Sequence, residues 1–387
     1  MPELFTRAAT AGACAAMVGV GALLAVYGPA LPEWKAQFGL SDAAAGSGLA
    51  LQSLGAVVGA VAVQPVLRRR GNRFALAASL SLVVVGSVVI ALAPSWGLTL
   101  AGAVVAGLGL GGCDALVTQL FLIGHGERGP ALVNIAHACF GIGTVAAPAL
   151  VAVVGSGRYR WVFVGVGVIC LVGLATLRGV RPRPTPGESA RDAARSERLS
   201  GSALAVVGGF LVLYIAHFAV QSGIGSWEPV RLLDLGHSPA VAGLATSGYW
   251  LAMVIGRFLA APLAHRVSAA ALVIASAAGM TAAVALACYG PATVWAYLLA
   301  GLFIGPIFPN GLTWLAQTGY AHGPAFAYIV AAAMAGAVVC PPLLGALVGA
   351  HGAGALAPAL LSGSVIAMSG ALAAWASSRS SSSGPTV

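Results

Sequence analysis

Long apolar stretches, separated by short polar breaks, follow one another along the whole chain. Most contain about 20 or more residues, the length that a helix needs to cross the roughly 30 Å hydrocarbon core of a bilayer. The pattern predicts twelve membrane-spanning helices, at residues 8–31, 41–66, 74–94, 97–123, 130–153, 161–178, 202–225, 240–264, 269–289, 292–318, 324–350 and 355–376. The apolar part of the first stretch is too long for a signal peptide, so we expect it to remain as a helix.

Composition supports an all-α integral membrane protein. Of the 387 residues, 59% are hydrophobic and 7% are charged, and the mean hydropathy is +0.94, whereas a soluble domain carries about 25% charged residues. The six cysteines lie inside apolar stretches at spacings that fit neither a metal site nor a disulfide framework, so we interpret them as packing residues. The sequence contains no phosphate-binding loop, zinc-binding helix or nucleophile elbow. We therefore expect no enzyme activity, catalytic residue, cofactor or metal.

The positive charges indicate how the chain crosses the membrane. With the N-terminus inside, fifteen of the 19 lysine and arginine residues fall on the inner side and four on the outer side. This positive-inside bias predicts that both termini are cytoplasmic, and it explains the net charge of +9 without a nucleic-acid partner. Eighteen of the basic residues are arginine, and alanine and glycine are abundant, as is typical of a GC-rich bacterial genome. The expected location is the bacterial cytoplasmic membrane, with lipid as the surrounding partner.

The chain divides into two similar halves. Residues 179–200 are rich in proline, arginine and serine and predict a cytoplasmic linker between a six-helix bundle at 1–178 and another at 201–376, followed by a disordered tail at 377–387. The sequence of one half aligns on the other at 54–69 with 251–266, at 107–111 with 301–305 and at 143–150 with 336–343. A duplicated six-helix unit is typical of transporters that work by alternating access, with a small-molecule site between the halves. We expect a monomer.

Asp114, in "GLGLGGCDALVTQ", is the one acid in the interior of a predicted span. It lies about 15 Å from the end of its span, where a charged side chain is costly and should face protein or a watery cavity. Gly107, Gly111 and Thr118 share its helix face, a strip that suits close packing. We interpret Asp114 as a proton-coupling group, with His137 in the next span as a possible relay, because histidine titrates near cellular pH. The alternative is a carboxylate that is hydrogen-bonded for structure.

Several other spans carry polar groups beside aromatic rings. Such a mixture suits a cavity that binds a small polar solute, with rings that stack on it and amides that hydrogen-bond it. The candidate substrate-binding residues are Gln52, Asn134, His217, Gln221, Trp250, Asn310, Trp314 and Gln317. The alternative for each of them is that it packs against neighbouring side chains and does not contact a solute.

"RRRGNR", at residues 68–73, joins the second and third predicted spans on the inner side. With these features the sequence resembles the major facilitator superfamily over essentially its whole length. Arg69, Gly71 and Arg73 match that superfamily's loop between spans two and three, although Gln64 and Arg68 replace its glycine and aspartate. The repeat of this loop carries Arg257 and Arg266. The resemblance implies two pseudo-symmetric six-helix bundles and a gating function for these five residues.

Within the superfamily, the motifs are most similar to the fucose permease-like bacterial sugar–proton symporters. "GLGLGGCDALVTQ" resembles their fourth span, with an acid at Asp114, and "LVNIAHACFGIGTVAAP" and "GLFIGPIFPNGL" resemble their fifth and tenth spans. Gln221 stands where their seventh span has a glutamate, and Gly28 lies near the position of a first-span aspartate. The resemblance implies transport of a sugar-like solute with protons, and the missing acids concentrate proton coupling on Asp114.

Two other functions remain open. "GTVAAPAL" shares a proline with the fifth-span signature of drug and metabolite efflux antiporters but lacks its glycines. A sensor built on a transporter fold would need no titratable group in the middle of a span, so Asp114 disfavours it.

The predicted topology can be tested at Ser189, in the linker. A cysteine introduced at this position should react with a membrane-impermeant maleimide only after the cells are permeabilised, because the linker is cytoplasmic. The same labelling of the wild type gives the background from the native cysteines. Labelling of the variant from outside intact cells would contradict the topology.

Overall fold

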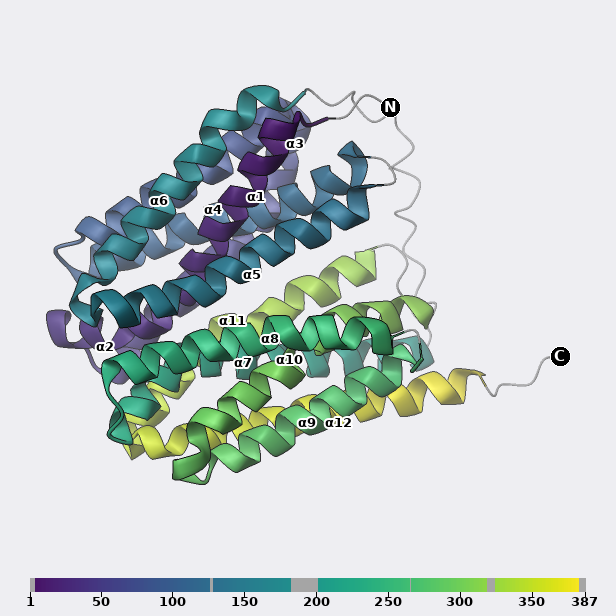
Figure 1. Ribbon diagram of the computed structural model, residues 1–387. Helices are drawn as coiled ribbons and strands as arrows, with labels where there is room; N and C mark the ends of the chain where they lie inside the picture. The colour runs from purple at the N-terminus through teal and green to yellow at the C-terminus, as the bar shows by residue number, and fades with distance from the viewer. Residues whose placement is uncertain (1–3, 126–127, 182–200, 265, 319–323, 383–387) are drawn as a thin grey trace. The chain divides into compact units, whose positions relative to one another are not determined.

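The chain folds into helices throughout the described residues of the computed structural model, which are 4–125, 128–181, 201–264, 266–318 and 324–382 (Figure 1). The α-helices are α1 Arg7–Ala25, α2 Tyr27–Phe38, α3 Asp42–Leu92, α4 Trp96–Gly124, α5 Gly129–Val154, α6 Tyr159–Thr176, α7 Gly201–Asp234, α8 Pro239–Leu263, α9 Ala269–Ala287, α10 Thr293–Gln317, α11 Pro324–His351 and α12 Leu356–Ser382. Within these residues, eleven helices are long and apolar enough to cross a membrane. Large apolar side chains such as Val153, Trp161 and Trp295 are exposed, as lipid-facing residues are.

The 51-residue helix α3 contains two spans rather than one. Gly71 interrupts it with φ 80° and ψ 173°, a backbone conformation that is open to glycine and strained for other residues. Ala56, before this break, and Ser79, after it, both contact α4 near Gly111 and Gly112. The chain therefore reverses at Gly71, and the two legs of α3 lie along α4. They correspond to the predicted spans 41–66 and 74–94 and bring the number of spans to twelve.

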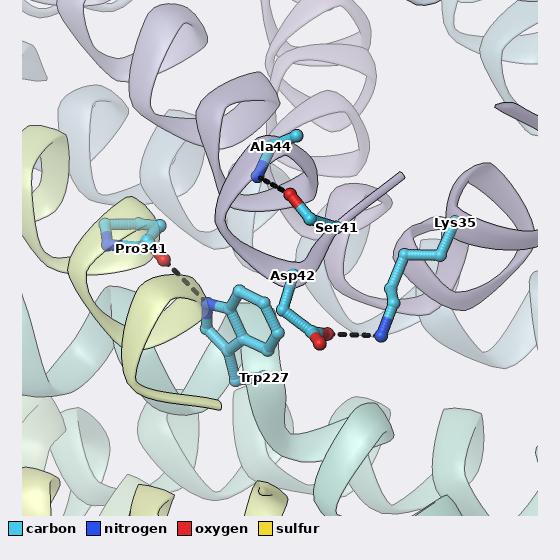
Figure 2. Close-up of polar contacts among 6 residues, drawn as sticks. All are labelled: Lys35, Ser41, Asp42, Ala44, Trp227 and Pro341. Atoms are coloured by element: carbon cyan, nitrogen blue, oxygen red, sulfur yellow. Dashed lines mark hydrogen bonds and ion pairs between the residues drawn. The ribbon is translucent and has the colours of Figure 1, made fainter. Parts of the chain in front are cut away.

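The predicted span at 8–31 is present, but it is not one regular helix. The helix ends at Ala25 and a second one begins at Tyr27. Pro29 has no N–H to donate to the carbonyl of Ala25, and its ring crowds that carbonyl, so the regular helix is interrupted one turn before the proline. At the far end of α2, Lys35 forms an ion pair with Asp42 at the start of α3 (Figure 2).

Ser41 caps the start of α3. Its hydroxyl oxygen accepts a hydrogen bond of 3.2 Å from the backbone N–H of Ala44 (Figure 2). A cap of this kind gives a partner to one of the N–H groups that the first helical turn leaves without one.

Helices approach each other closely at glycines, and the contacts recur in both halves of the sequence. A side chain at Gly59 would overlap the carbonyl oxygen of Leu108, and one at Gly256 would overlap that of Leu302. In the same way, Gly111 lies against Ala56 in the first half, and Gly305 lies against Met253 in the second. Gly143 lies against Val18 in the first half, and Gly336 lies against Ile215 in the second. The aligned segments of the two halves therefore make equivalent helix contacts, as a duplicated unit predicts.

Contacts divide the chain into two compact units. The first consists of residues 1–185 together with 228–250, and the second of 186–227 together with 251–387. In the first unit, α1 packs on α5 and α6, and α3 packs on α4 and α6; in the second, α9 packs on α10 and α12. The segment 228–250 belongs to the first unit because α8 begins directly against α5: Gly243 lies against Ala152, and Ser247 Oγ donates a 2.7 Å hydrogen bond to Val145 O. The predicted halves at 1–178 and 201–376 differ from the observed units in this segment.

The predicted disordered tail at 377–387 is wrong for its first part, because α12 continues to Ser382. The hydroxyl of Ser378 donates to the carbonyl of Trp375 at 2.8 Å, and the guanidinium of Arg379 lies 4.7 Å from the centre of the Trp375 ring. These contacts within the helix favour its last turns. Residues 383–387, and 182–200 of the predicted linker, lie outside the described residues.

The glycine contacts predict how substitutions affect stability. Gly59→Ala and Gly256→Ala should each lower the free energy of unfolding by about 1–3 kcal/mol, because a methyl group must push a helix backbone away. Gly165→Ala and Gly208→Ala are matched controls, since nothing lies within 4 Å of the added group. The controls should unfold at or above the wild-type temperature in detergent, and equal losses for all four variants would contradict the packing.

Candidate functional site

Asp114, Thr118 and His137 come together between α4 and α5 in the first unit. His137 Nε2 lies 3.5 Å from Asp114 Oδ1 and 3.5 Å from Thr118 Oγ1. The imidazole nitrogen is therefore close enough to exchange a hydrogen bond with either oxygen. The side chain of Asp114 is 48% exposed and that of His137 is 40% exposed. The cluster is therefore only partly enclosed by the described residues.

The packing of α4 explains how Asp114 is positioned. Gly107 and Gly111, in the two turns before it, contact the backbone of α3 at Gln52 and Ala56. The small-residue strip predicted from the sequence therefore packs against α3 as far as Gly111. Beyond it, the side chain of Asp114 emerges from the α3–α4 interface and reaches α5.

Sequence analysis missed a second polar pair on the same helices. Gln64 Nε2 in α3 donates a 3.2 Å hydrogen bond to Gln119 Oε1 in α4. Both residues stand inside or at the edge of predicted spans, where an amide needs a partner. The presence of one glutamine in each of two neighbouring predicted spans could have indicated this pair.

Two predicted binding residues of the first unit are buried with one polar atom unused. Gln52 donates through Nε2 to Leu23 O at 3.3 Å, but its Oε1 accepts no hydrogen bond from the described residues. Trp250 is 6% exposed, and its indole Nε1 has no acceptor there either. One acceptor and one donor are thus available in the first unit. Asn134, one turn before His137 on α5, is exposed.

The predicted binding residues of the second unit lie on α7 and α10. His217 is 1% exposed, its ring packs edge-on against Phe218, and its Nδ1 lacks a partner in the described part of the chain. Trp314 is also buried, with its ring 4.8 Å from that of Phe210. Gln221 is half-buried on α7.

The other two residues of this set lie on α10. Asn310 donates to Pro306 O at 2.8 Å, and Gln317 is exposed. The side chain of Asn310 is thus bonded to its own helix.

Most of the predicted gating residues are exposed. Arg69 ends the first leg of α3, Arg73 begins the second, and Arg266 follows α8. Gly71 provides the reversal between the legs, so the predicted loop is reduced to one residue.

Arg257 is different, because it stabilises α10. Pro309 cannot donate to the carbonyl of Gly305, and Arg257 Nε supplies a 3.3 Å hydrogen bond to that carbonyl instead.

The statement that Asp114 is the one acid inside a span is wrong. The seventh helix was predicted to end at residue 225, but α7 continues to Asp234 and includes Glu228, which is 1% exposed. The polar residues after 225 suggested a loop. Burial of this segment among the residues of the first unit instead keeps it helical.

Two buried tryptophans provide a test of the unused donor. Trp227 Nε1 donates a 3.0 Å hydrogen bond to Pro341 O (Figure 2), whereas Trp250 Nε1 has no acceptor in the described residues. Trp227→Phe should therefore destabilise the protein by about 0.5–1.5 kcal/mol more than Trp250→Phe. Thermal unfolding of both variants in detergent measures the difference. A larger loss for Trp250→Phe would mean that its N–H is already used for structure.

Solved structures of transporters share this fold. A D-xylose–proton symporter has a TM-score of 0.79 with 19% identity, and the match covers 95% of this chain and 97% of that one. The inward-open xylose transporter XylE from E. coli has a TM-score of 0.73 with 16% identity, covering 95% and 94%. A point mutant of the nucleoside transporter NupG has a TM-score of 0.75 with 11% identity, covering 95% and 99%.

A search of curated proteins by sequence gives no match. The family model of the Major Facilitator Superfamily matches residues 13–231, more than half of the chain. With twelve spans, a duplicated six-helix unit and this match, the chain belongs to the major facilitator superfamily and is a multi-pass membrane transporter rather than an enzyme.

Proposed function

We propose that this transporter moves a small, sugar-like polar solute together with protons, and that Asp114 is the coupling group. The observation that carries the proposal is the cluster of Asp114, Thr118 and His137. It places a carboxylate and an imidazole within 3.5 Å of each other in helices that are otherwise almost free of charge. Titratable groups inside membrane spans are costly and mark proton or substrate pathways.

Unused polar atoms on the predicted binding residues support a polar solute. Gln52 Oε1 and Trp250 Nε1, both in the first unit, are buried without partners among the described residues. A buried polar atom without a partner is unfavourable, so a ligand that supplies hydrogen bonds gains affinity there. A hydroxylated solute both donates and accepts, as this set requires. The related structures carry the names of xylose and nucleoside transporters, which handle solutes of this chemistry.

The coupling mechanism follows from the accessibility of the cluster. Asp114 is half-exposed, so water can bring a proton to it or take one away, and His137 Nε2 is close enough to relay that proton. A neutral carboxylic acid enters a closed, dry site at lower cost than a carboxylate. Protonation of Asp114 therefore favours the conformational change between outward-facing and inward-facing states, and water on the other side of the membrane removes the proton.

The remaining assignments follow from the sequence. We place the protein in the bacterial cytoplasmic membrane with both termini inside, because the arginines are concentrated on one side. We propose that it acts as a monomer. Arg69, Gly71, Arg73 and Arg266 would act at the inner ends of the helices, where the chain must bend or slide during the transition.

A ligand screen tests the class of solute. Purified protein should gain thermal stability with sugars such as D-xylose or with nucleosides, because a ligand that binds the folded state raises its unfolding temperature. Stabilisation by amphipathic drugs without any by sugars or nucleosides would favour an efflux antiporter instead.

Asp114→Asn tests the coupling. This variant imitates the protonated carboxyl, so in proteoliposomes it should lose uphill accumulation of the stabilising solute under a pH gradient but retain exchange and downhill flux. Asp42→Asn is the matched control, since Asp42 pairs with Lys35 at the start of α3. The control should accumulate solute as the wild type does. Uphill transport by Asp114→Asn with an unchanged pH profile would make Asp114 a structural residue.

A further inference from the structure

Glu228 is a buried acid that the proposed mechanism does not use. It lies six residues before the end of α7 and is 1% exposed. Neither carboxyl oxygen accepts a hydrogen bond from any described residue. An ionised carboxylate in such a place is strongly unfavourable, and a group of this kind usually takes up a proton instead.

The hydroxyl group near Glu228 suits the protonated form. Thr246, on α8, has its side chain beside the Glu228 carboxyl and is itself fully buried. Its hydroxyl donates a 3.1 Å hydrogen bond to Ala242 O. Its oxygen still has lone pairs. A neutral Glu228 can donate its own hydrogen to Thr246 Oγ1, which a carboxylate cannot do.

The charged groups on the surrounding elements leave Glu228 without a counter-charge. Arg231, one turn along α7, donates through NH1 to Asp234 at 2.7 Å, and its Nε is buried without a partner in the described chain. Glu33 of α2 has the same sign as Glu228, and His237, after α7, is exposed. The residues of α5 and α8 that line the neighbouring cavity carry no charge.

A cavity lies beside residues that adjoin Glu228 and Thr246. It measures about 130 Å³ and is lined in the first unit by α2, α5, α7 and α8, including Glu33, Pro229, Leu233 and Ala242. Pro229 follows Glu228 directly, and Ala242 is the residue whose carbonyl binds Thr246. A polar-edged space of this size holds several water molecules.

We propose that Glu228 is a second proton-binding site, separate from Asp114, that controls the packing of residues 228–250 on α5. In this arrangement the neutral acid donates to Thr246. When the packing loosens, the Glu228 O–H bond breaks, its proton passes to water in the cavity, and the carboxylate pairs with Arg231 one turn away. Higher pH therefore favours the loosened form. The inference requires neither coupling through Asp114 nor a known solute.

Infrared spectroscopy of the purified full-length protein tests the proton directly. At neutral pH the wild type should show the carbonyl stretch of a buried, protonated carboxylic acid, sensitive to deuterium exchange. Glu228→Gln should lose this band. Asp42→Asn, at the start of α3 and away from Arg231, and Asp114→Asn should keep it. A wild-type spectrum without the band, or a band that survives in Glu228→Gln, would overturn the proposal.

Thr246→Val gives an independent result if Glu228→Gln does not fold. Without the threonine oxygen the acid loses its acceptor, so the band should move to higher frequency; an unchanged band would contradict the Glu228–Thr246 contact. If Asp114→Asn still accumulates solute uphill while the wild type shows the Glu228 band, the proposed function is rejected and this inference stands.

Maleimide labelling of Leu233→Cys, in the cavity wall, tests the effect on packing. From neutral to alkaline pH the rate should rise several-fold more when Glu228 is present than in the Leu233→Cys, Glu228→Gln double variant, which corrects for the pH dependence of the thiol itself. Equal increases would mean that Glu228 does not control the packing.

Discussion

Close approach of helix backbones at glycine is the interaction on which the two units depend. In a bilayer, lipid tails are as apolar as the side chains, so helices gain little from hydrophobic burial and must associate through close packing. The contact of Gly111 with Ala56 and its counterpart, Gly305 with Met253, are both too close to admit a methyl group. Because equivalent pairs recur in each half of the sequence, the duplicated unit is a repeated set of backbone contacts as well as a repeated motif.

Residues that interrupt the regular helical hydrogen bonding also shape the fold. Gly71 reverses α3 in one residue and places both legs on α4. Pro309 removes a donor from α10, and Arg257 on a neighbouring helix supplies the missing hydrogen bond. An arginine that resembles a gating residue by its position in the repeat is thus part of the packing of the second unit.

The two acids inside spans are in opposite situations. Asp114 is half-exposed and has an imidazole nitrogen 3.5 Å away. Glu228 is buried, and the hydroxyl beside it already donates elsewhere, so its environment favours the neutral form. The two acids therefore lie in different environments, one partly exposed beside a histidine and one buried beside a threonine.

The sequence by itself determined the class of protein, the duplication, and eleven of the twelve span positions to within a few residues at most ends, because apolar length, charge bias and repeated glycines are local properties of the chain. The tertiary structure decided where helices break and continue. The first predicted span divides before Pro29, α7 extends through Glu228, and α12 extends to Ser382. It also decided which polar atoms remain without partners. Burial and hydrogen bonding depend on residues distant in sequence, such as Thr246 beside Glu228, and the sequence pattern carries no information about that proximity.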